Sequence, residues 1–259
     1  MSADSLRLQG RARSIAEQIS AADAGVQAVV LYGSAAAGTA GPASDLDLLL
    51  VFDDRANVAA LRERAPDLFA ADVNRSFYRA ATLRRLRTPS HWAYVEHVRR
   101  WGIALIEHPD LNDVLCVPRP SGDQLAGDLE DWATRTLRPY DGEPRRMNGL
   151  YALGLARIFK VARSAVMLAN AHSDVFEHDR AAAFDAFAAR VPQAAGHLER
   201  LRALERCWMY EQGGRDVDGW QAARDVCPDD DTFQALMDGC WSLVAAAASC
   251  MRAPDKVAA

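Results

Sequence analysis

The stretch LYGSAAAGTAGPASDLDLLLVFD, residues 31–53, decides the fold of this chain. An apolar strand candidate at 27–32 ends at Gly33, and a second one at 46–52 follows a segment rich in glycine and alanine. A glycine at that turn lets the backbone come close to a bulky anion. Ser34 stands where a helix would begin, and a helix start offers free N–H groups and a positive dipole end to phosphate. The sequence therefore predicts an anion-binding turn between two strands.

Two aspartates stand at the start of the second strand candidate. Asp45 and Asp47 are two residues apart, so on a strand both side chains point to the same face. Neighbouring carboxylates repel each other, and a hard divalent cation relieves that repulsion; oxygen ligands and a phosphate-bearing substrate suit Mg²⁺. A strand that brings a cation to a phosphate site beside a helix start has the geometry that phosphoryl or nucleotidyl transfer requires.

Gly33-Ser34 followed by Ser44-Asp45-Leu46-Asp47 resembles the signature of the DNA polymerase β-like nucleotidyltransferase superfamily. The resemblance covers roughly residues 25–108. It implies that Asp45 and Asp47 hold Mg²⁺ on the triphosphate of a nucleotide, and that Gly33, Ser34 and Ser44 bind the nucleotide. The alternative is a strand with surface aspartates after a glycine-rich turn.

Members of this superfamily have a third carboxylate on a neighbouring strand. The segment ADVNRSFY, residues 71–78, alternates in polarity, and Asp72 lies on its polar face. The resemblance implies that Asp72 binds a second metal ion together with Asp45 and Asp47, and that it takes the proton of the acceptor hydroxyl. A strand-end aspartate facing water is the alternative. Three other carboxylates are fallback candidates for this role: Asp67, Glu96 and Glu107.

The chain has 30 basic residues, of which only Lys160 and Lys256 are lysines. Lys160 has Arg157 and Arg163 three residues to either side, so all three can share one helix face. In similar enzymes a basic residue of a helical domain reaches the phosphates, and the resemblance implies that role here. A face exposed to solvent is the alternative.

Strand signals fade after a fourth short strand candidate at 103–107, and the rest of the chain has helical spacing. We expect an α+β protein with a catalytic domain at 1–112, built on a small mixed sheet flanked by helices. A helical bundle at 113–259 would follow and bind the acceptor. Helices are expected at 4–21, 55–66, 81–87, 91–101, 121–137, 147–170, 179–190, 193–211 and 231–251.

Composition excludes several other classes of protein. The formal net charge of −5 argues against a nucleic-acid partner. No apolar run reaches the roughly 18 residues of a membrane helix, and the first residues lack the apolar core of a signal peptide. Five widely spaced cysteines without a CxxC pair make a zinc site or disulfide framework unexpected. We expect a cytoplasmic protein with reduced thiols; a homodimer stays open.

The resemblance implies transfer of a nucleoside monophosphate, AMP from ATP or the equivalent from another NTP, to a hydroxyl group with release of pyrophosphate. Two Mg²⁺ ions would assist. The helical second domain resembles those of aminoglycoside and lincosamide nucleotidyltransferases, so the acceptor is expected to be a small molecule such as an antibiotic or another specialised metabolite. Two alternatives remain open: an antitoxin-type enzyme that modifies a partner protein, and an inactive nucleotide-binding regulatory module.

Overall fold

The computed structural model divides the chain into two compact units, Met1–Arg119 and Pro120–Ala259. The expected boundary at residue 112 lies outside the described residues. The structure describes residues 1–42, 44–80, 89–108, 115–140, 150–177, 180–205, 207 and 219–253.

The first unit contains a four-stranded mixed sheet, as predicted. Its strands are β1 Val26–Tyr32, β2 Leu46–Phe52, β3 Val73–Arg79 and β4 Ile103–Ile106. Strand β2 runs antiparallel to β1 and parallel to β3, and β4 pairs antiparallel with the other edge of β1. The order across the sheet is therefore β3-β2-β1-β4.

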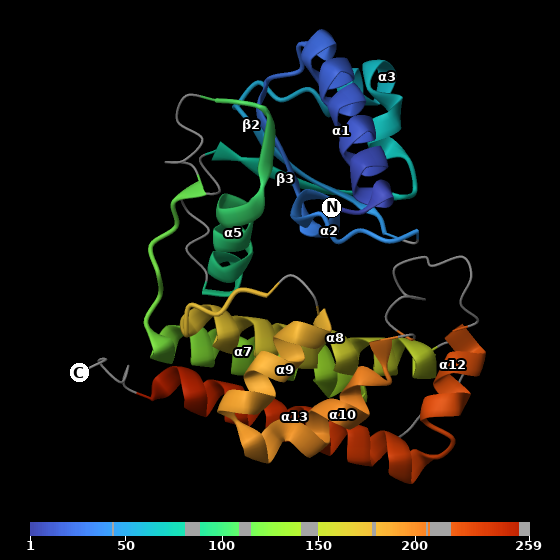
Figure 1. Ribbon diagram of the computed structural model, residues 1–259, viewed down its shortest axis with the longest axis vertical. Coiled ribbons are helices and arrows are strands. Elements are labelled where there is room, and N and C mark those ends of the chain that lie inside the picture. The colour runs from blue at the N-terminus through green and yellow to red at the C-terminus, as the bar shows by residue number, and fades with distance from the viewer. Residues whose placement is uncertain are drawn as a thin grey trace. The chain divides into compact units, whose positions relative to one another are not determined.

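Helices cover both faces of this sheet (Figure 1). Side chains alternate along β2. Leu46, Leu48 and Leu50 therefore pack into one buried cluster with α1 (Ala3–Ala22), whereas Leu49 and Val51 pack into another with α5 (Pro89–Trp101). A strand buried on both faces needs a continuous apolar run, which residues 48–52 supply. The elements around the sheet are α1 Ala3–Ala22, α2 Gly33–Ala37, α3 Val58–Arg64, the 3₁₀ turn η1 Pro66–Phe69 and α5 Pro89–Trp101.

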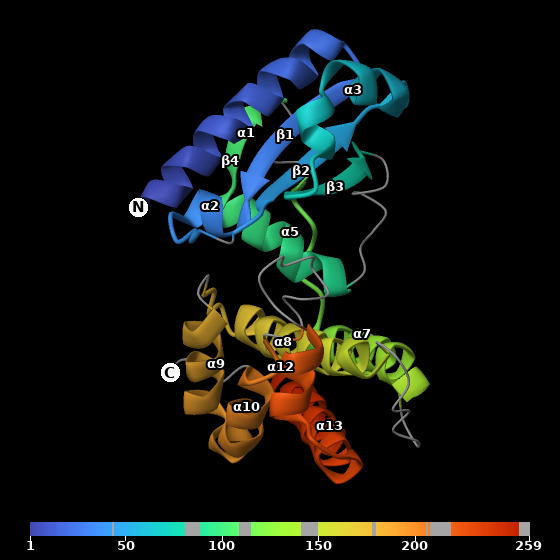
Figure 2. The same ribbon diagram turned by 90° about the vertical axis from the view of Figure 1, so that its right-hand side faces the viewer.

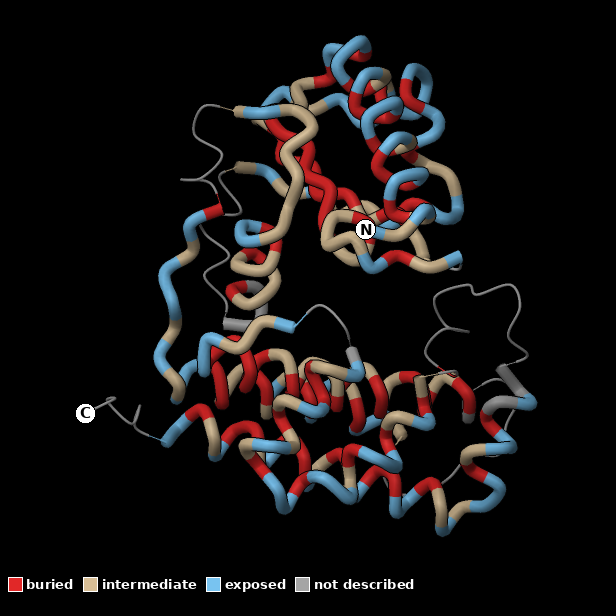
Figure 3. Tube along the Cα trace, viewed as in Figure 1, coloured by how far each residue is buried: buried red, intermediate tan, exposed pale blue. Residues whose placement is uncertain are grey.

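The second unit is helical, again as predicted. Its central helix α8 packs against the other long helices of the unit, and α7 and α13 also pack on each other (Figure 2). Figure 3 shows buried residues along the inner sides of these helices and along the strands of the first unit. The elements are α7 Gly122–Leu137, η2 Arg138–Tyr140, α8 Leu150–His172, α9 Arg180–Arg190, η3 Pro192–Ala194, α10 Ala195–Arg202, α12 Gly219–Val226 and α13 Asp230–Arg252.

Some boundaries differ from the sequence-based expectations. Strand β3 begins at Val73 because residues 71 and 72 form a turn, and the helix expected at 55–66 is shorter and is followed by η1. Helix α12 was missed, since the glycines before it were interpreted as a loop. The helix expected at 81–87 lies outside the described residues. Within the described part of the chain, no helix has the length and apolar character needed to cross a membrane.

Candidate active site

Strand β2 brings Asp47 between two neighbouring strands. In the register of the sheet, Asp47 pairs with Tyr32 of β1 on one side and with Asn74 of β3 on the other. The side chains of Asp47 and Asn74 interact, since Asn74 Nδ2 donates a hydrogen bond to Asp47 Oδ1 at 2.8 Å. Asn74 is not predicted as a site residue from the sequence, although it shares the polar face of the 71–78 alternation with Asp72.

Gly33 lies directly against the Asp47 carboxylate. Its backbone φ is +72°, and a Cβ atom placed on it would stand 2.2 Å from Asp47 Oδ2. Any other residue would therefore push the carboxylate away, in addition to being strained at that φ. The structure thus brings Gly33 of the predicted turn against Asp47 of β2. Ser34 lies in α2, a single short turn of helix.

Asp45 directly precedes β2 and is half-buried. The parallel pairing of Leu46 with Val73 makes Asp45 and Asp72 level with each other, and the Leu46 N–H donates to the Asp72 carbonyl oxygen at 2.9 Å. The backbones that carry these two carboxylates are therefore neighbours.

The Asp72 side chain is held elsewhere. Both terminal nitrogens of Arg11 donate to its carboxylate, Nη2 to Oδ1 at 2.9 Å and Nη1 to Oδ2. Arg11 belongs to α1, which covers the face opposite to α5, whereas Tyr32, the cross-strand partner of Asp47, packs on the α5 side. The structure thus places Asp72 beside Asp45 in the register but pairs its carboxylate with an arginine. Sequence reasoning missed Arg11, because nothing local connects it to a residue 61 positions away.

Two of the three fallback carboxylates, Asp67 and Glu96, have polar or cationic partners. Asp67 accepts a hydrogen bond from Gln18 Nε2 at 2.7 Å. Glu96 accepts hydrogen bonds from Arg99 and Arg100, and the Arg99 contact above all lowers the pKa of this carboxyl group. Glu107 follows β4, on the far side of β1 from Asp47. Among the described residues, no three or more histidine, cysteine, aspartate or glutamate side chains are grouped to hold a metal ion.

A cluster of hydroxyl groups lies on the α5 side of the sheet next to Asp47. The Tyr32 hydroxyl and Ser76 Oγ are 3.3 Å apart, and the Tyr94 ring packs edge-on against the Tyr32 ring with 5.2 Å between centroids. Burial, together with the charge of Asp47, raises the pKa of Tyr32 to about 12. Burial also raises the pKa of Tyr94. These phenols therefore stay protonated beside the carboxylate at neutral pH.

Helix α1 anchors the glycine-rich segment that precedes β2. Ser2 Oγ donates to the Ala40 carbonyl at 2.6 Å, the Ala40 N–H donates to Ser5 Oγ, and Gln9 Nε2 donates to the Ala35 carbonyl at 2.9 Å. Ser5 and Gln9 are buried. Their hydrogen bonds satisfy backbone groups that would otherwise be costly to bury.

Ser44, predicted to bind the nucleotide, has a local role in the structure. Its Oγ accepts a hydrogen bond from the Gly41 N–H at 3.0 Å, and its own N–H donates to the Gly41 carbonyl. These two bonds close the turn just before Asp45. Ser44 therefore stabilises the turn that directly precedes Asp45.

Arg157, Lys160 and Arg163 lie on α8 in the second unit. All three are half-buried, whereas the residues between them are buried, so they occupy one partly exposed stripe of the helix as their spacing predicts. Their contact with a nucleotide stays a prediction.

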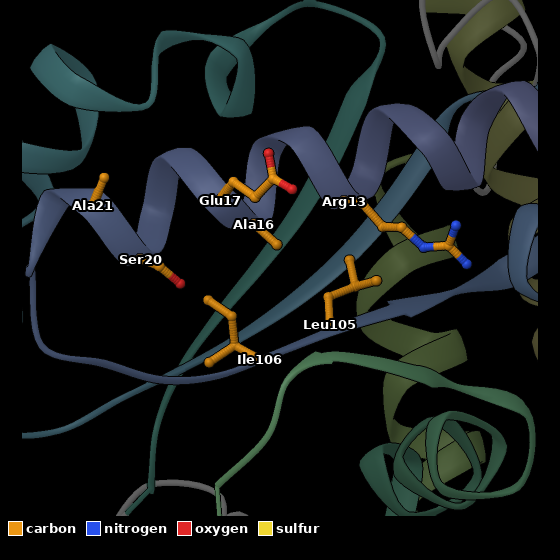
Figure 4. A pocket seen from close by; sticks show the side chains of 7 residues that line it. All are labelled: Arg13, Ala16, Glu17, Ser20, Ala21, Leu105 and Ile106. Atoms are coloured by element: carbon orange, nitrogen blue, oxygen red, sulfur yellow. The ribbon is translucent and has the colours of Figure 1, made fainter.

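A hollow in the first unit lies away from these residues. It is lined by residues of α1 from Arg13 to Ala21 and by Leu105 and Ile106 of β4, at the opposite edge of the sheet from β3 (Figure 4). None of the predicted site residues lines it.

Comparison with known proteins supports the interpretation of the motif. Residues 12–92 match the family model described as a nucleotidyltransferase domain. The match spans β1, β2 and β3, and with them Gly33, Asp45, Asp47 and Asp72. No curated protein matches this chain.

Proposed function

We propose, on the premise that residues 12–92 form a DNA polymerase β-like nucleotidyltransferase domain, that this chain transfers a nucleoside monophosphate from an NTP to a hydroxyl group of a small molecule. The observation that carries this proposal is the contact of the Asp47 carboxylate with the backbone of Gly33. It joins the turn expected to bind phosphate with the aspartates expected to bind a cation, and nucleotidyl transfer needs the two in one place.

The donor atoms fit a divalent cation in part. Asp45 and Asp47 supply carboxylate oxygens two residues apart, which suits Mg²⁺, while the third carboxylate, Asp72, is engaged by Arg11. A bound Mg²⁺ would neutralise charge on the phosphates and lower the pKa of a nearby hydroxyl group. We propose Asp45 and Asp47 as its first ligands, and Asp72 as an additional ligand for a second ion.

The protein groups would act as follows. Gly33, Ser34 and Ser44 bind and orient the triphosphate. The acceptor hydroxyl oxygen forms a bond to the α-phosphorus as the bond from that phosphorus to the bridging oxygen breaks, and pyrophosphate leaves. The hydroxyl proton passes to a carboxylate, for which Asp72 is our candidate.

Lys160, with Arg157 and Arg163, is proposed to add positive charge to the triphosphate. The three share one partly exposed stripe of α8. Lys160→Met should raise the KM for the nucleotide with a smaller change in kcat, because a binding charge is lost and the reacting groups are untouched. Ser164→Ala, one position along the same stripe, is the control. An unchanged KM in Lys160→Met would dismiss this role.

We further propose AMP from ATP as the transferred group, and an antibiotic or another specialised metabolite as the acceptor. The net charge of −5 favours a cationic acceptor, since long-range attraction raises its local concentration. The experiment is release of pyrophosphate in the presence of Mg²⁺ and each NTP, against a panel of aminoglycosides, lincosamides and a cell extract. Mass spectrometry then identifies the modified acceptor; a modified protein instead of a small molecule would contradict the acceptor class.

Two variants test the catalytic assignment. Asp45→Asn and Asp47→Asn should each lower turnover about 100-fold or more, because metal ligation accounts for several kcal/mol of transition-state stabilisation. Asp54→Asn, at an exposed position beyond the other end of β2, is the matched control and should stay active. Near-normal turnover in either of the first two variants would refute the proposed site.

A further inference from the structure

We propose that Arg11 controls the binding of a second divalent cation at this site by holding the Asp72 carboxylate away from Asp45 and Asp47. The inference rests on the proposed function, because it concerns the same cation site. It goes further in assigning a role to a residue of α1 that lies outside the motif.

The two sides of the site differ in how their carboxylates are held. The Asp47 carboxylate has neighbours on β3 and α2: Asn74 Nδ2 donates to Oδ1 at 2.8 Å, and Oδ2 is 2.2 Å from the position of a Cβ on Gly33. These contacts give the Asp47 carboxylate a defined orientation, two residues from Asp45, which suits a cation that uses both side chains.

The Asp72 carboxylate is instead neutralised by a cation that the protein itself supplies. Arg11 binds both of its oxygens, and the planar guanidinium matches the carboxylate geometry. A metal ion that needed Asp72 would have to displace Arg11. The Asp72 backbone is already in place for this exchange, because the Leu46 N–H holds its carbonyl beside the start of β2. In this exchange the Asp72 side chain would turn from Arg11 toward Asp45, which is level with it in the register.

The Arg11–Asp72 ion pair is accessible to solvent, so a metal ion can replace Arg11 at the Asp72 carboxylate. The side chains are 30% and 60% exposed, respectively, and exposed ion pairs contribute little to stability because water and salt compete with them. Arg11 also has a second carboxylate in range, since the charge of Asp67 interacts with it. Arg11 would therefore not be left without a negative neighbour when Asp72 turned to a metal ion.

The test measures binding of Mn²⁺ alone to the full chain by the paramagnetic signal of the free ion. Wild type should bind one Mn²⁺ more tightly and a second one more weakly. Arg11→Met should tighten the second site about fivefold, the upper end of what an exposed ion pair contributes. Asp72→Asn, and the double variant with Arg11→Met, should lose the second site and keep the first.

Two variants on the same helix serve as controls. Arg7→Met removes one positive charge a turn earlier on α1, where Arg7 pairs with Asp4. Gln18→Met removes the other hydrogen bond that ties α1 to the segment before β3, Gln18 to Asp67. Both should bind Mn²⁺ as wild type does. Arg11→Gln is a second variant at the key position, and urea unfolding of each protein verifies that it is folded.

Separate outcomes would overturn the inference and the proposed function. If Arg11→Met and Arg11→Gln bind Mn²⁺ as wild type does, or if tighter binding persists when Asp72 is also changed, Arg11 does not control a second site. If Asp45→Asn and Asp47→Asn retain the tight site, the proposed metal centre itself fails, whatever the Arg11 variants do.

Discussion

Gly33 is the single residue whose identity the site constrains most clearly. Its φ of +72° disfavours any side chain, and the Asp47 Oδ2 atom takes up the space of a Cβ. Gly38 offers a comparison, because its φ is +82° but its nearest neighbours, atoms of Met1, are at ordinary contact distance. Substitutions at the two glycines therefore distinguish two effects: both strain the backbone, but only a substitution of Gly33 also displaces the Asp47 carboxylate.

Gly33→Ala should destabilise the protein by about 1–2 kcal/mol, the cost of a left-handed conformation for a residue with a Cβ. It should also weaken Mn²⁺ binding and nucleotide transfer, because the new methyl group displaces Asp47. Gly38→Ala should lose similar stability and retain Mn²⁺ binding. Urea unfolding and Mn²⁺ titration of the two variants test this, and equal Mn²⁺ affinities would contradict the role of the Gly33–Asp47 contact.

Tyr32 makes the free energy of unfolding depend on pH in the alkaline range. Burial and the Asp47 charge raise its pKa to about 12, so the folded protein favours the neutral phenol more strongly than the unfolded chain does. That contribution is fully present below the unfolded pKa near 10 and is lost as pH rises toward 12. The free energy of unfolding should therefore fall less steeply over this range in Tyr32→Phe than in wild type. Parallel slopes in urea unfolding between pH 9 and 11.5 would contradict the assignment.

At the scale of elements, α1 supports the segment that carries the motif. Gln9→Leu removes the donor to the buried Ala35 carbonyl and should lower the free energy of unfolding by about 1–3 kcal/mol. Because Ala35 belongs to α2, directly after Gly33-Ser34, the same variant should raise the KM for the nucleotide. Gln18→Leu, which removes only an exposed hydrogen bond on the same helix, should change both quantities little. Equal effects in the two variants would argue against this support role.

The strands show what sequence patterns can and cannot predict. The bounds of β2 were predicted correctly, because residues 46–52 are apolar except for Asp47 and are flanked by polar residues on both sides. The alternation at 71–78 placed β3 nearly correctly but extended it through Asp72, which lies in a turn and points to α1. Alternation of polar and apolar residues indicates a strand, but it does not show which side chain the residue before the strand binds. The contact of Asp72 with Arg11 could therefore not be predicted from it.

The partners of the site residues follow from the tertiary fold. Asn74 could have been found from the 71–78 pattern only if the parallel register of β2 and β3 had been known. Arg11 has no local signal, since its pairing with Asp72 depends on how α1 crosses the sheet. The motif residues themselves were predicted from sequence because a glycine turn and an aspartate pair on a strand carry their geometry locally.

At the scale of the whole molecule, each of the two units has its own buried core. Leu48 is fully buried between α1 and the sheet in the first unit, and Leu155 is fully buried on α8 in the second. The chain divides into two compact units, and each of these leucines lies in the core of its own unit. The residues that approach Asp47 described above all lie in the first unit.

Two core variants should therefore act on different parts of the molecule. Leu48→Ala and Leu155→Ala should each lower the stability of their own unit by about 2–5 kcal/mol, because each leaves a cavity in a packed core. Scanning calorimetry should show two unfolding transitions. Leu48→Ala should lower the midpoint temperature of one of them, and Leu155→Ala that of the other. Below the lower transition, Leu155→Ala should still bind Mn²⁺ at the tight site, since Asp45 and Asp47 belong to the other unit. If both variants instead shift one common transition, the two cores unfold as one cooperative structure and the tight site depends on the whole chain.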